Sequence, residues 1–408
     1  MPEMFKREKY YKKVEPFIDK PVIKVISGIR RCGKSTFLKL LINKLQTDGI
    51  AEKSILLINK DSLEFDFIKT YTELDSFVKK KFKKISGKKY LFIDEVQEIE
   101  EWERAVTGFF TDNIADIYIT GSNSGMLSSE LATLLTGRYI EIRMNTLTFS
   151  EFLFFRQKKT EEKENEFMLF LKYGGFPGIH HITQNDEVVA QYIGSLYNTV
   201  LLKDVVSRNQ VRDVGLLERI TRFIADNCGN ITSAKGINDY LKSQKLSSSV
   251  DTIHNYLFWL VSANFIDKVN RYDIKGKRQL ELYEKYFLAD IGFMYGLLGD
   301  RVEDISGKLE NIVYLELKSR GYQVNIGKLY DKEVDFIARK NNETKYFQVS
   351  YLLSDEKVVN REFGILESLR DNHPKIVLSM DKFLGENKNG IRWLNLIDFL
   401  LEENNPAH

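Results

Sequence analysis

The sequence lacks the residues that disulfide-rich, zinc-binding and membrane proteins need. Its 408 residues include two cysteines, Cys32 and Cys228, and five scattered histidines. Two distant cysteines exclude a disulfide framework and, with so few histidines, give no zinc-ligand spacing. No apolar run approaches the roughly 20 residues of a membrane helix. The charged N-terminus has no apolar core, so we expect no signal peptide. These absences predict a cytoplasmic protein without a membrane partner.

Strong net charge is also missing. The formal net charge is +2, so a nucleic-acid surface would have to be a local basic patch. A hydrophobic fraction of 43% and a charged fraction of 29% are ordinary for a folded protein. The length favours roughly two to four domains.

A phosphate-binding loop is the strongest motif. A compact apolar strand, 22–27, precedes the segment GIRRCGKS, 28–35, which fits G-x-x-x-x-G-K-[ST] in full. A helical apolar stripe follows it. Glycines let the loop turn its N–H groups toward phosphate oxygens beside a helix N-terminus. We expect Lys34 to bridge the β- and γ-phosphates of ATP and Ser35 to bind Mg²⁺. The expected nucleotide-binding residues are Gly28, Arg31, Cys32, Gly33, Lys34, Ser35 and Thr36.

An acidic pair after a buried strand completes the predicted ATPase site. The strand 90–93 ends in Asp94 and Glu95, about 60 residues after the loop. Asp94 is expected to hold the Mg²⁺ shell and Glu95 to act as general base toward water. Because both acids are present, we predict hydrolysis as well as binding.

Two further signals follow this pair. The strand 116–124 ends in polar residues that could sense the γ-phosphate, and the candidates Thr120, Ser122 and Asn123 stay open. Arg138 stands just before a fifth strand, 139–144. This order of pieces resembles the AAA+ ATPases. There, an arginine at this place reaches the nucleotide of a neighbouring subunit, which would imply an oligomer. A local salt bridge is the alternative for Arg138.

The middle of the chain changes pattern twice. A helical region, 148–208, contains GGFP at 174–177 and resembles a lid in which backbone near Pro177 touches adenine; the alternative is a helix C-cap and a turn. Residues 209–300 read as three helices and a hairpin, which resembles a winged helix-turn-helix. DNA contact is expected from the hairpin, and a protein–protein module is the alternative. The candidate DNA contacts are Arg271, Lys275, Lys277 and Arg278.

The last segment, 301–408, resembles the PD-(D/E)XK restriction-type nucleases. A helix carrying Glu310 precedes strands with Glu333, Asp335 and Gln348. Such nucleases need carboxylates for Mg²⁺ and a lysine near water. Here the third motif reads Gln348-Val349-Ser350, which lacks the acid and the lysine. Lys357 or Arg361 could reach the site from the following segment. We therefore predict a retained nuclease fold that does not cleave.

The whole chain resembles a prokaryotic family with all four parts. The predicted fold class is α/β multidomain: an AAA+ P-loop core (1–147), a helical lid (148–208), a winged helix (209–300) and a restriction-endonuclease-like domain (301–408). The expected function is Mg²⁺-dependent ATP hydrolysis by a homo-oligomer that drives or gates the binding of DNA or a protein partner. The alternatives are an ATP-gated DNA nuclease and a nucleotide switch that assembles proteins without DNA.

Overall fold

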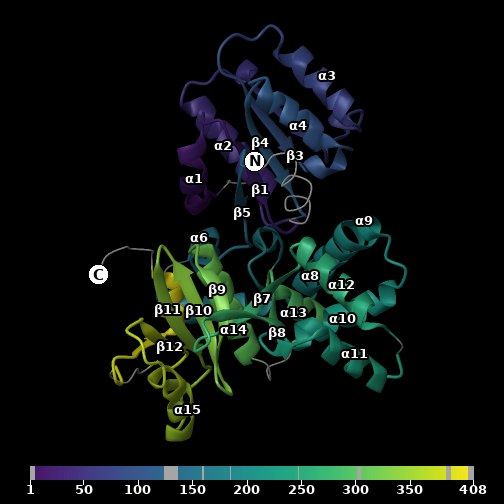
Figure 1. Cartoon of the computed structure of the whole chain (residues 1–408). Helices are drawn as coiled ribbons and strands as arrows, with labels where there is room; N and C mark the ends of the chain where they lie inside the picture. The colour runs from purple at the N-terminus through teal and green to yellow at the C-terminus, as the bar shows by residue number, and fades with distance from the viewer. Residues whose placement is uncertain are drawn as a thin grey trace. The chain divides into compact units, whose positions relative to one another are not determined.

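The chain forms two compact units in the computed structural model. The structure describes residues 5–123, 137–158, 160–183, 185–246, 248–300, 305–382 and 387–402. The first unit contains residues 1–145 with 262–264, and the second contains 146–261 with 265–408 (Figure 1). No helix within the described residues has both the length and the apolar character that crossing a membrane requires.

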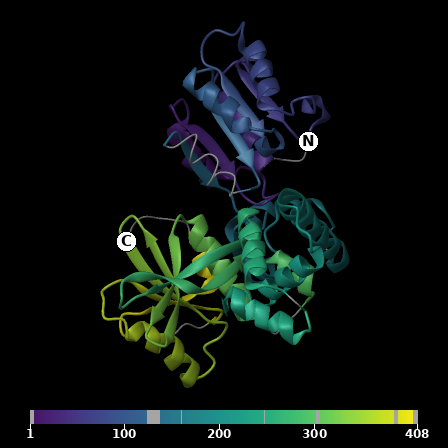
Figure 2. The same ribbon diagram turned by 45° about the vertical axis from the view of Figure 1, so that its right-hand side comes forward.

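The first unit is a parallel sheet between helices. Its strand order is β2-β3-β4-β1-β5, so β4 lies between the strands that precede the two ATPase motifs. Apolar residues of α3 and α4 pack with β1, β3 and β4 in one core, and α2 contacts the sheet separately (Figure 2). The elements are α1 Glu8–Val14, η1 Glu15–Phe17, β1 Ile23–Ser27, α2 Lys34–Thr47, η2 Glu52–Ser54, β2 Ile55–Asn59, η3 Leu63–Phe65, α3 Tyr71–Phe82, β3 Tyr90–Asp94, η4 Val96–Glu98, α4 Trp102–Thr111, β4 Asp116–Gly121 and β5 Tyr139–Arg143.

The strand β1 is not wholly apolar. Lys24 is its second residue, is fully buried and forms an ion pair with Asp116 of β4. A buried charge of this kind is tolerated because it has a partner. Ile23, Val25 and Ile26 of β1 supply its apolar contacts, and the unit has a P-loop α/β fold.

The second unit begins with helices. Thr148 caps α6 through a capping box with Glu151, and Ser233 caps α11. The helices are α6 Phe149–Phe155, η5 Thr160–Glu162, α7 Lys163–Tyr173, η6 Pro177–His181, α8 Asp186–Thr199, the π-helix η7 Val200–Val206, α9 Ser207–Asn209, α10 Val214–Asp226, α11 Ala234–Ser243, α12 Val250–Ser262, α13 Gly292–Leu298, α14 Ile305–Ser319, α15 Glu356–Glu367 and α16 Leu396–Leu401.

A single eight-stranded sheet runs through this unit, in the order β13-β12-β11-β10-β9-β7-β8-β6. The strands are β6 Ile231–Thr232, β7 Ile266–Asp273, β8 Arg278–Leu288, β9 Gln323–Leu329, β10 Lys332–Lys340, β11 Glu343–Val349, β12 Lys375–Ser379 and β13 Arg392–Asn395. The strands β7 and β9 pair in parallel, with Arg271 opposite Ile326. The sheet is therefore continuous across residue 300, where the sequence led us to place a domain boundary.

Candidate functional site

The phosphate-binding loop joins β1 to α2 in a conformation that requires its glycines. Gly33 has φ +106° and stands at the N-cap of α2. Gly28 has φ +144°, and a Cβ there would lie 2.2 Å from the carbonyl oxygen of Met144. A side chain at either position would be strained. Cys32 of the loop is buried, whereas Arg31 and Thr36 are exposed. The first N–H groups of α2 are donors that could bind phosphate.

The Lys34 side chain folds back over its own loop. Its ammonium nitrogen donates to the carbonyl oxygens of Gly28 at 2.9 Å and Ile29 at 3.2 Å. It also lies 3.8 Å from Oε1 of Glu95. The lysine is 3% exposed, so these acceptors replace water around the charge. The oxygens of a bound phosphate could replace the loop carbonyls as acceptors for the Lys34 ammonium, and they carry negative charge.

Thr120 connects the two acids that follow β3. Its hydroxyl donates to Oδ1 of Asp94 and accepts from the backbone N–H of Glu95 at 2.9 Å. The three residues meet because β3 and β4 are neighbouring parallel strands. Of the three open sensor candidates, the structure therefore places Thr120 directly on the acidic pair. Ser122 is buried and Asn123 half-buried beyond the end of β4.

Asp94 has the surroundings of a metal-binding carboxylate. Burial raises its pKa above the ordinary value, while hydrogen bonds with Thr120 and Ser35 act in the opposite direction. The Ser35 hydroxyl and the Asp94 carboxylate thus lie side by side, one from each ATPase motif. A serine hydroxyl and one carboxylate are the donor set that nucleotide-bound Mg²⁺ takes from a P-loop protein, so these residues fit the ion.

Glu95 is held by its neighbours in a left-handed conformation, with φ +54°. The amide of Gln97 donates to its carboxylate, and the Arg30 guanidinium lies 3.9 Å away. A non-glycine residue at positive φ is costly and is frequent at functional sites. The sequence interpretation did not single out Arg30, although its position inside the loop was a signal that it would lie near the acids.

Arg138 lies at the end of the sheet opposite the phosphate-binding loop. Its carbonyl oxygen accepts from the N–H of Ile23, the first residue of β1, at 2.8 Å. The phosphate-binding loop follows the last residue of β1, about 13 Å along the strand. Arg138 is exposed, and its guanidinium lies 5.8 Å from the Phe110 ring centroid. Among the described residues it forms no ion pair, so the local salt bridge considered for it is absent there.

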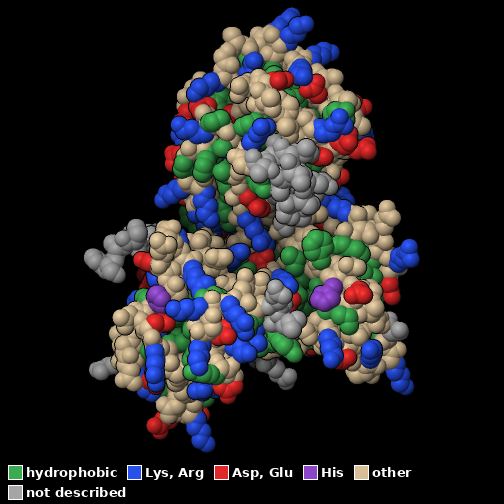
Figure 3. Space-filling view, in the orientation of Figure 1, with side chains coloured by type: hydrophobic (Ala, Val, Ile, Leu, Met, Phe, Trp, Pro, Cys, Tyr) green, Lys and Arg blue, Asp and Glu red, His purple; other side chains and the backbone are tan. Residues whose placement is uncertain are grey.

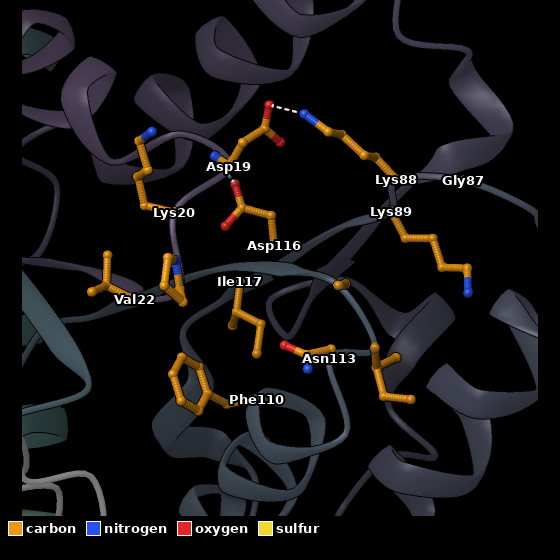
Figure 4. Close-up of a pocket in the computed structure, with 13 residues that line it drawn as sticks. Asp19, Lys20, Val22, Gly87, Lys88, Lys89, Phe110, Asn113, Asp116 and Ile117 are labelled. Carbon is orange, nitrogen blue, oxygen red and sulfur yellow. Dashed lines mark hydrogen bonds and ion pairs between the residues drawn. The ribbon is translucent and has the colours of Figure 1, made fainter.

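A pocket of about 340 Å³ opens at this same end of the sheet (Figure 4). Asp19 forms an ion pair with Lys88 at 2.5 Å and accepts from the Tyr90 hydroxyl at 2.8 Å. Asp116 is engaged by Lys24. Because Asp19 and Asp116 already have partners within the first unit, we assign these two acids a structural role and not a ligand-binding one.

The GGFP turn is held by a buried acid that the sequence interpretation did not use. Asp290 accepts from the N–H of Gly175 at 2.9 Å and of Gly292 at 2.8 Å. Burial raises the pKa of Asp290 to about 6. Pro177 begins η6 directly after this turn. The turn is thus tied to the loop between β8 and α13.

Three of the four residues expected at the degenerate nuclease site, Glu310, Glu333 and Asp335, surround a lysine that the sequence did not mark. Lys285 of β8 places its ammonium nitrogen 2.7 Å from Oε1 of Glu333 and 3.0 Å from Oε2 of Glu310. Burial alone would lower the pKa of Lys285, but the charges of Glu310, Asp335 and Glu333 raise it. We call Lys285, Glu310, Glu333 and Asp335 the carboxylate cluster. Gln348 lies beside it, with Oε1 3.4 Å from the backbone N of Asp335.

The two other cations considered for this place, Lys357 and Arg361, are exposed. Arg361 is 71% exposed on its side chain and pairs with Glu362 at 2.6 Å. Burial and the charge of Glu310 raise the pKa of Asp335 well above its ordinary value. Across the described ranges, no group of three or more His, Cys, Asp or Glu side chains is arranged to hold a metal ion. Lys285 is therefore the cation that the carboxylate cluster contains.

The basic residues expected to contact DNA lie on the β7–β8 hairpin. Arg271 is half-buried on β7, whereas Lys275, Lys277 and Arg278 are exposed at the turn and the start of β8. The Lys275 ammonium lies 4.7 Å from the ring centroid of Tyr330. The hairpin tip therefore lies beside the β9–β10 turn.

Two family models match the sequence. One is described as an AAA domain and covers residues 20–153, and the other is a domain of unknown function (DUF8612) that covers 164–304. The structure also resembles that of a Thermotoga maritima RuvB mutant. That match has 17% identity and a TM-score of 0.32, and it covers 65% of this chain and 90% of the other.

Two relatives match much more of the sequence. An uncharacterized protein of Haemophilus influenzae is 35% identical over 98% of this chain and 99% of its own length. An uncharacterized protein of Methanocaldococcus jannaschii is 32% identical over 82% of this chain and 75% of its own length. The AAA domain and the P-loop α/β fold indicate nucleotide-dependent activity. The chain belongs to the same family as these two relatives, and its residues 20–153 match the AAA domain.

Proposed function

We propose that the protein is a Mg²⁺-dependent ATPase. The observation that carries this proposal is the meeting of both motifs at one place: Ser35 bonds Asp94, and Lys34 lies 3.8 Å from Glu95. Lys34 would exchange its loop carbonyls for phosphate oxygens. Glu95 would accept the proton of the attacking water. Bound Mg²⁺, held by Ser35 and Asp94, would neutralise charge on the phosphates.

The test is Glu95→Gln, measured by ATP binding and by steady-state turnover. We expect binding to be retained and turnover to fall at least about 100-fold, because an amide cannot accept the proton. Glu98→Gln, at an exposed glutamate of the same loop, is the matched control. Unchanged turnover in Glu95→Gln would exclude the general-base role.

Hydrolysis is proposed to occur between copies of the chain. Arg138 is exposed at the end of the sheet remote from its own phosphate-binding loop, which supports a role toward the nucleotide of a neighbour rather than its own. An arginine so placed stabilises transition-state charge. Backbone near Pro177 is proposed to contact adenine from the lid, 148–208. A cytoplasmic location stays a prediction that the two free, buried cysteines fit.

The segment 209–300 is proposed as a winged helix that contacts nucleic acid through Arg271, Lys275, Lys277 and Arg278. Support comes from the order of α10, α11, α12 and the β7–β8 hairpin, and from the exposed cations at its tip. A nucleotide switch that assembles proteins without DNA is the alternative. Loss of salt-dependent DNA affinity in Lys277→Glu with Arg278→Glu would exclude that alternative.

The segment 301–408 is proposed as a restriction-endonuclease-like domain that binds without cleaving. Its order of α14, β9, β10, β11, α15 and β12 supports the fold. Lys285 favours the rival reading, an ATP-gated nuclease, because it brings a lysine to the carboxylates. We favour binding because Gln348 of β11 and Ser350, which directly follows that strand, stand where such a nuclease has its acid and its lysine. Cleavage of labelled DNA with Mn²⁺ and ATP, lost in Asp335→Ala, would establish the rival.

A further inference from the structure

We infer that the second unit binds single-stranded nucleic acid in a groove lined by tyrosines and unpaired cations. This inference rests on the proposed nucleic-acid contact of the β7–β8 hairpin and names the ligand class. The groove has a volume of about 840 Å³. It lies between this hairpin, the β9–β10 turn, the strands β10 and β11, and the segment after α15. We call it the tyrosine groove. No residue of the carboxylate cluster is among those that line it.

Two tyrosines offer aromatic surface in the groove. Tyr330 is 64% exposed at the β9–β10 turn and has φ +57°. An exposed aromatic side chain in a left-handed conformation costs stability, and such a cost is commonly retained where a side chain binds something. The second ring belongs to Tyr272, which is half-buried on β7. The guanidinium of Arg339 lies 4.1 Å from the ring centroid of Tyr272, so a flat cation stacks on a flat ring.

The cations of the groove have no acidic partner in the part of the chain that the structure describes. Four cations line the groove: Lys275, Lys277, Arg339 and Arg370. None of them forms an ion pair or a side-chain hydrogen bond with a described residue. Figure 3 shows Lys and Arg side chains over β9 and β10 on one face of this unit. Unpaired Lys and Arg side chains beside aromatic rings match the phosphates and bases of a nucleic-acid strand.

The two acids that line the groove are already engaged. Asp371 accepts from the Tyr346 hydroxyl at 2.8 Å and from the N–H of His373 at 3.1 Å. Glu367 accepts from Asn389 at 3.0 Å. Four cations thus outnumber two acids, and the groove favours an anionic ligand.

The aromatic rings select among anionic ligands. In a duplex, base faces are covered by neighbouring bases and cannot stack on Tyr330. An acidic peptide would use the cations but not the rings. A single strand uses both, because each unpaired base exposes a flat face and each linkage carries a phosphate. The observations therefore favour single-stranded nucleic acid over duplex DNA or an acidic protein segment.

The test measures binding of the full-length protein to a fluorescein-labelled oligothymidylate by anisotropy across salt concentrations. We expect Tyr330→Ala to weaken binding about tenfold, the size of one lost base stack. Tyr330→Phe keeps the ring and should bind as the native protein does. Phe154→Ala removes another exposed aromatic residue and is the matched control. Lys275→Glu with Lys277→Glu should lower the salt slope by about 1.4.

The outcomes separate this inference from the proposed function. Equal binding of oligothymidylate and duplex, unaffected by Tyr330→Ala, would overturn the inference and leave the hairpin contact with DNA intact. Competition by polyglutamate as strong as that by unlabelled oligothymidylate would also overturn it, in favour of an acidic protein partner. If neither oligothymidylate nor duplex binds at low salt, both the inference and the proposed contact of the hairpin with nucleic acid are wrong. None of these outcomes bears on ATP turnover, which the Glu95→Gln variant tests separately.

Discussion

The ammonium nitrogen of Lys285 lies 2.7 Å from Oε1 of Glu333, although the two residues come from β8 and β10, which are not neighbours in the sheet. The Lys285 side chain is 3% exposed. The Glu333 side chain is 26% exposed, so the lysine is the buried member of the pair, and little water can replace a partner that it loses. The stability of the second unit should therefore depend on this one lysine.

Replacement of Lys285 by methionine should lower the free energy of unfolding by about 3–5 kcal/mol, because buried carboxylates would lose their counter-ion. Urea denaturation measures this change. Lys382→Met is the control: its partner Glu164 and Lys382 itself are exposed, so the loss should stay under about 1 kcal/mol. Equal effects of the two variants would mean that the carboxylate cluster does not need the charge.

Thr120→Val should impair both folding and turnover. The substitution keeps the shape but removes the hydroxyl that bonds Asp94 and the N–H of Glu95. We expect a loss of about 1–3 kcal/mol in stability, since two buried polar groups lose their partner. Turnover should fall as well, while Thr120→Ser stays near the native values. A Thr120→Val enzyme with native turnover would show that the hydroxyl does not position the acids.

Mixing two inactive variants tests whether Arg138 acts on a neighbour. Arg138→Ala should reduce turnover roughly 10³-fold and leave ATP binding unchanged. Combined with Glu95→Gln, it should recover part of the activity, because one interface then contains an intact Glu95 and an intact Arg138. Lys88→Ala, at an exposed lysine of the same end of the sheet, is the control. Native turnover of Arg138→Ala would exclude the role.

Asp290 should make stability fall as pH rises through the acid range. Its pKa is raised to about 6 from 3.8, so the folded state holds its proton where the unfolded state has lost it. Below about pH 4 both states are protonated. Between about pH 4 and pH 6 this group costs the folded state up to about 3 kcal/mol, and the cost then stays constant.

A comparison with Asp290→Asn isolates this effect, since all other groups cancel. The difference in unfolding free energy, native minus variant, should decline between about pH 4 and pH 6 and remain level above that range. A difference that does not change with pH would show that Asp290 titrates normally.

The phosphate-binding loop and the acidic pair could be recognised because each is contiguous in the sequence. Lys285 could not be predicted, since it stands 25 positions before Glu310 and reaches the cluster only through the fold. Lys24 was hidden for a related reason: its burial depends on Asp116, which lies 92 positions away. The tyrosine groove draws Tyr330, Tyr272 and Arg339 from different strands and turns, so no local pattern marks it.

The parallel pairing of β7 with β9 has a consequence for dissecting the protein. A chain cut near residue 300 would leave two half-sheets, each with a bare row of backbone N–H and C=O groups along β7 or β9. Exposed edges of this kind recruit other strands and promote aggregation. The segments 209–300 and 301–408 should therefore be expressed as one piece, and insolubility of either fragment would report a severed sheet rather than a defective binding site.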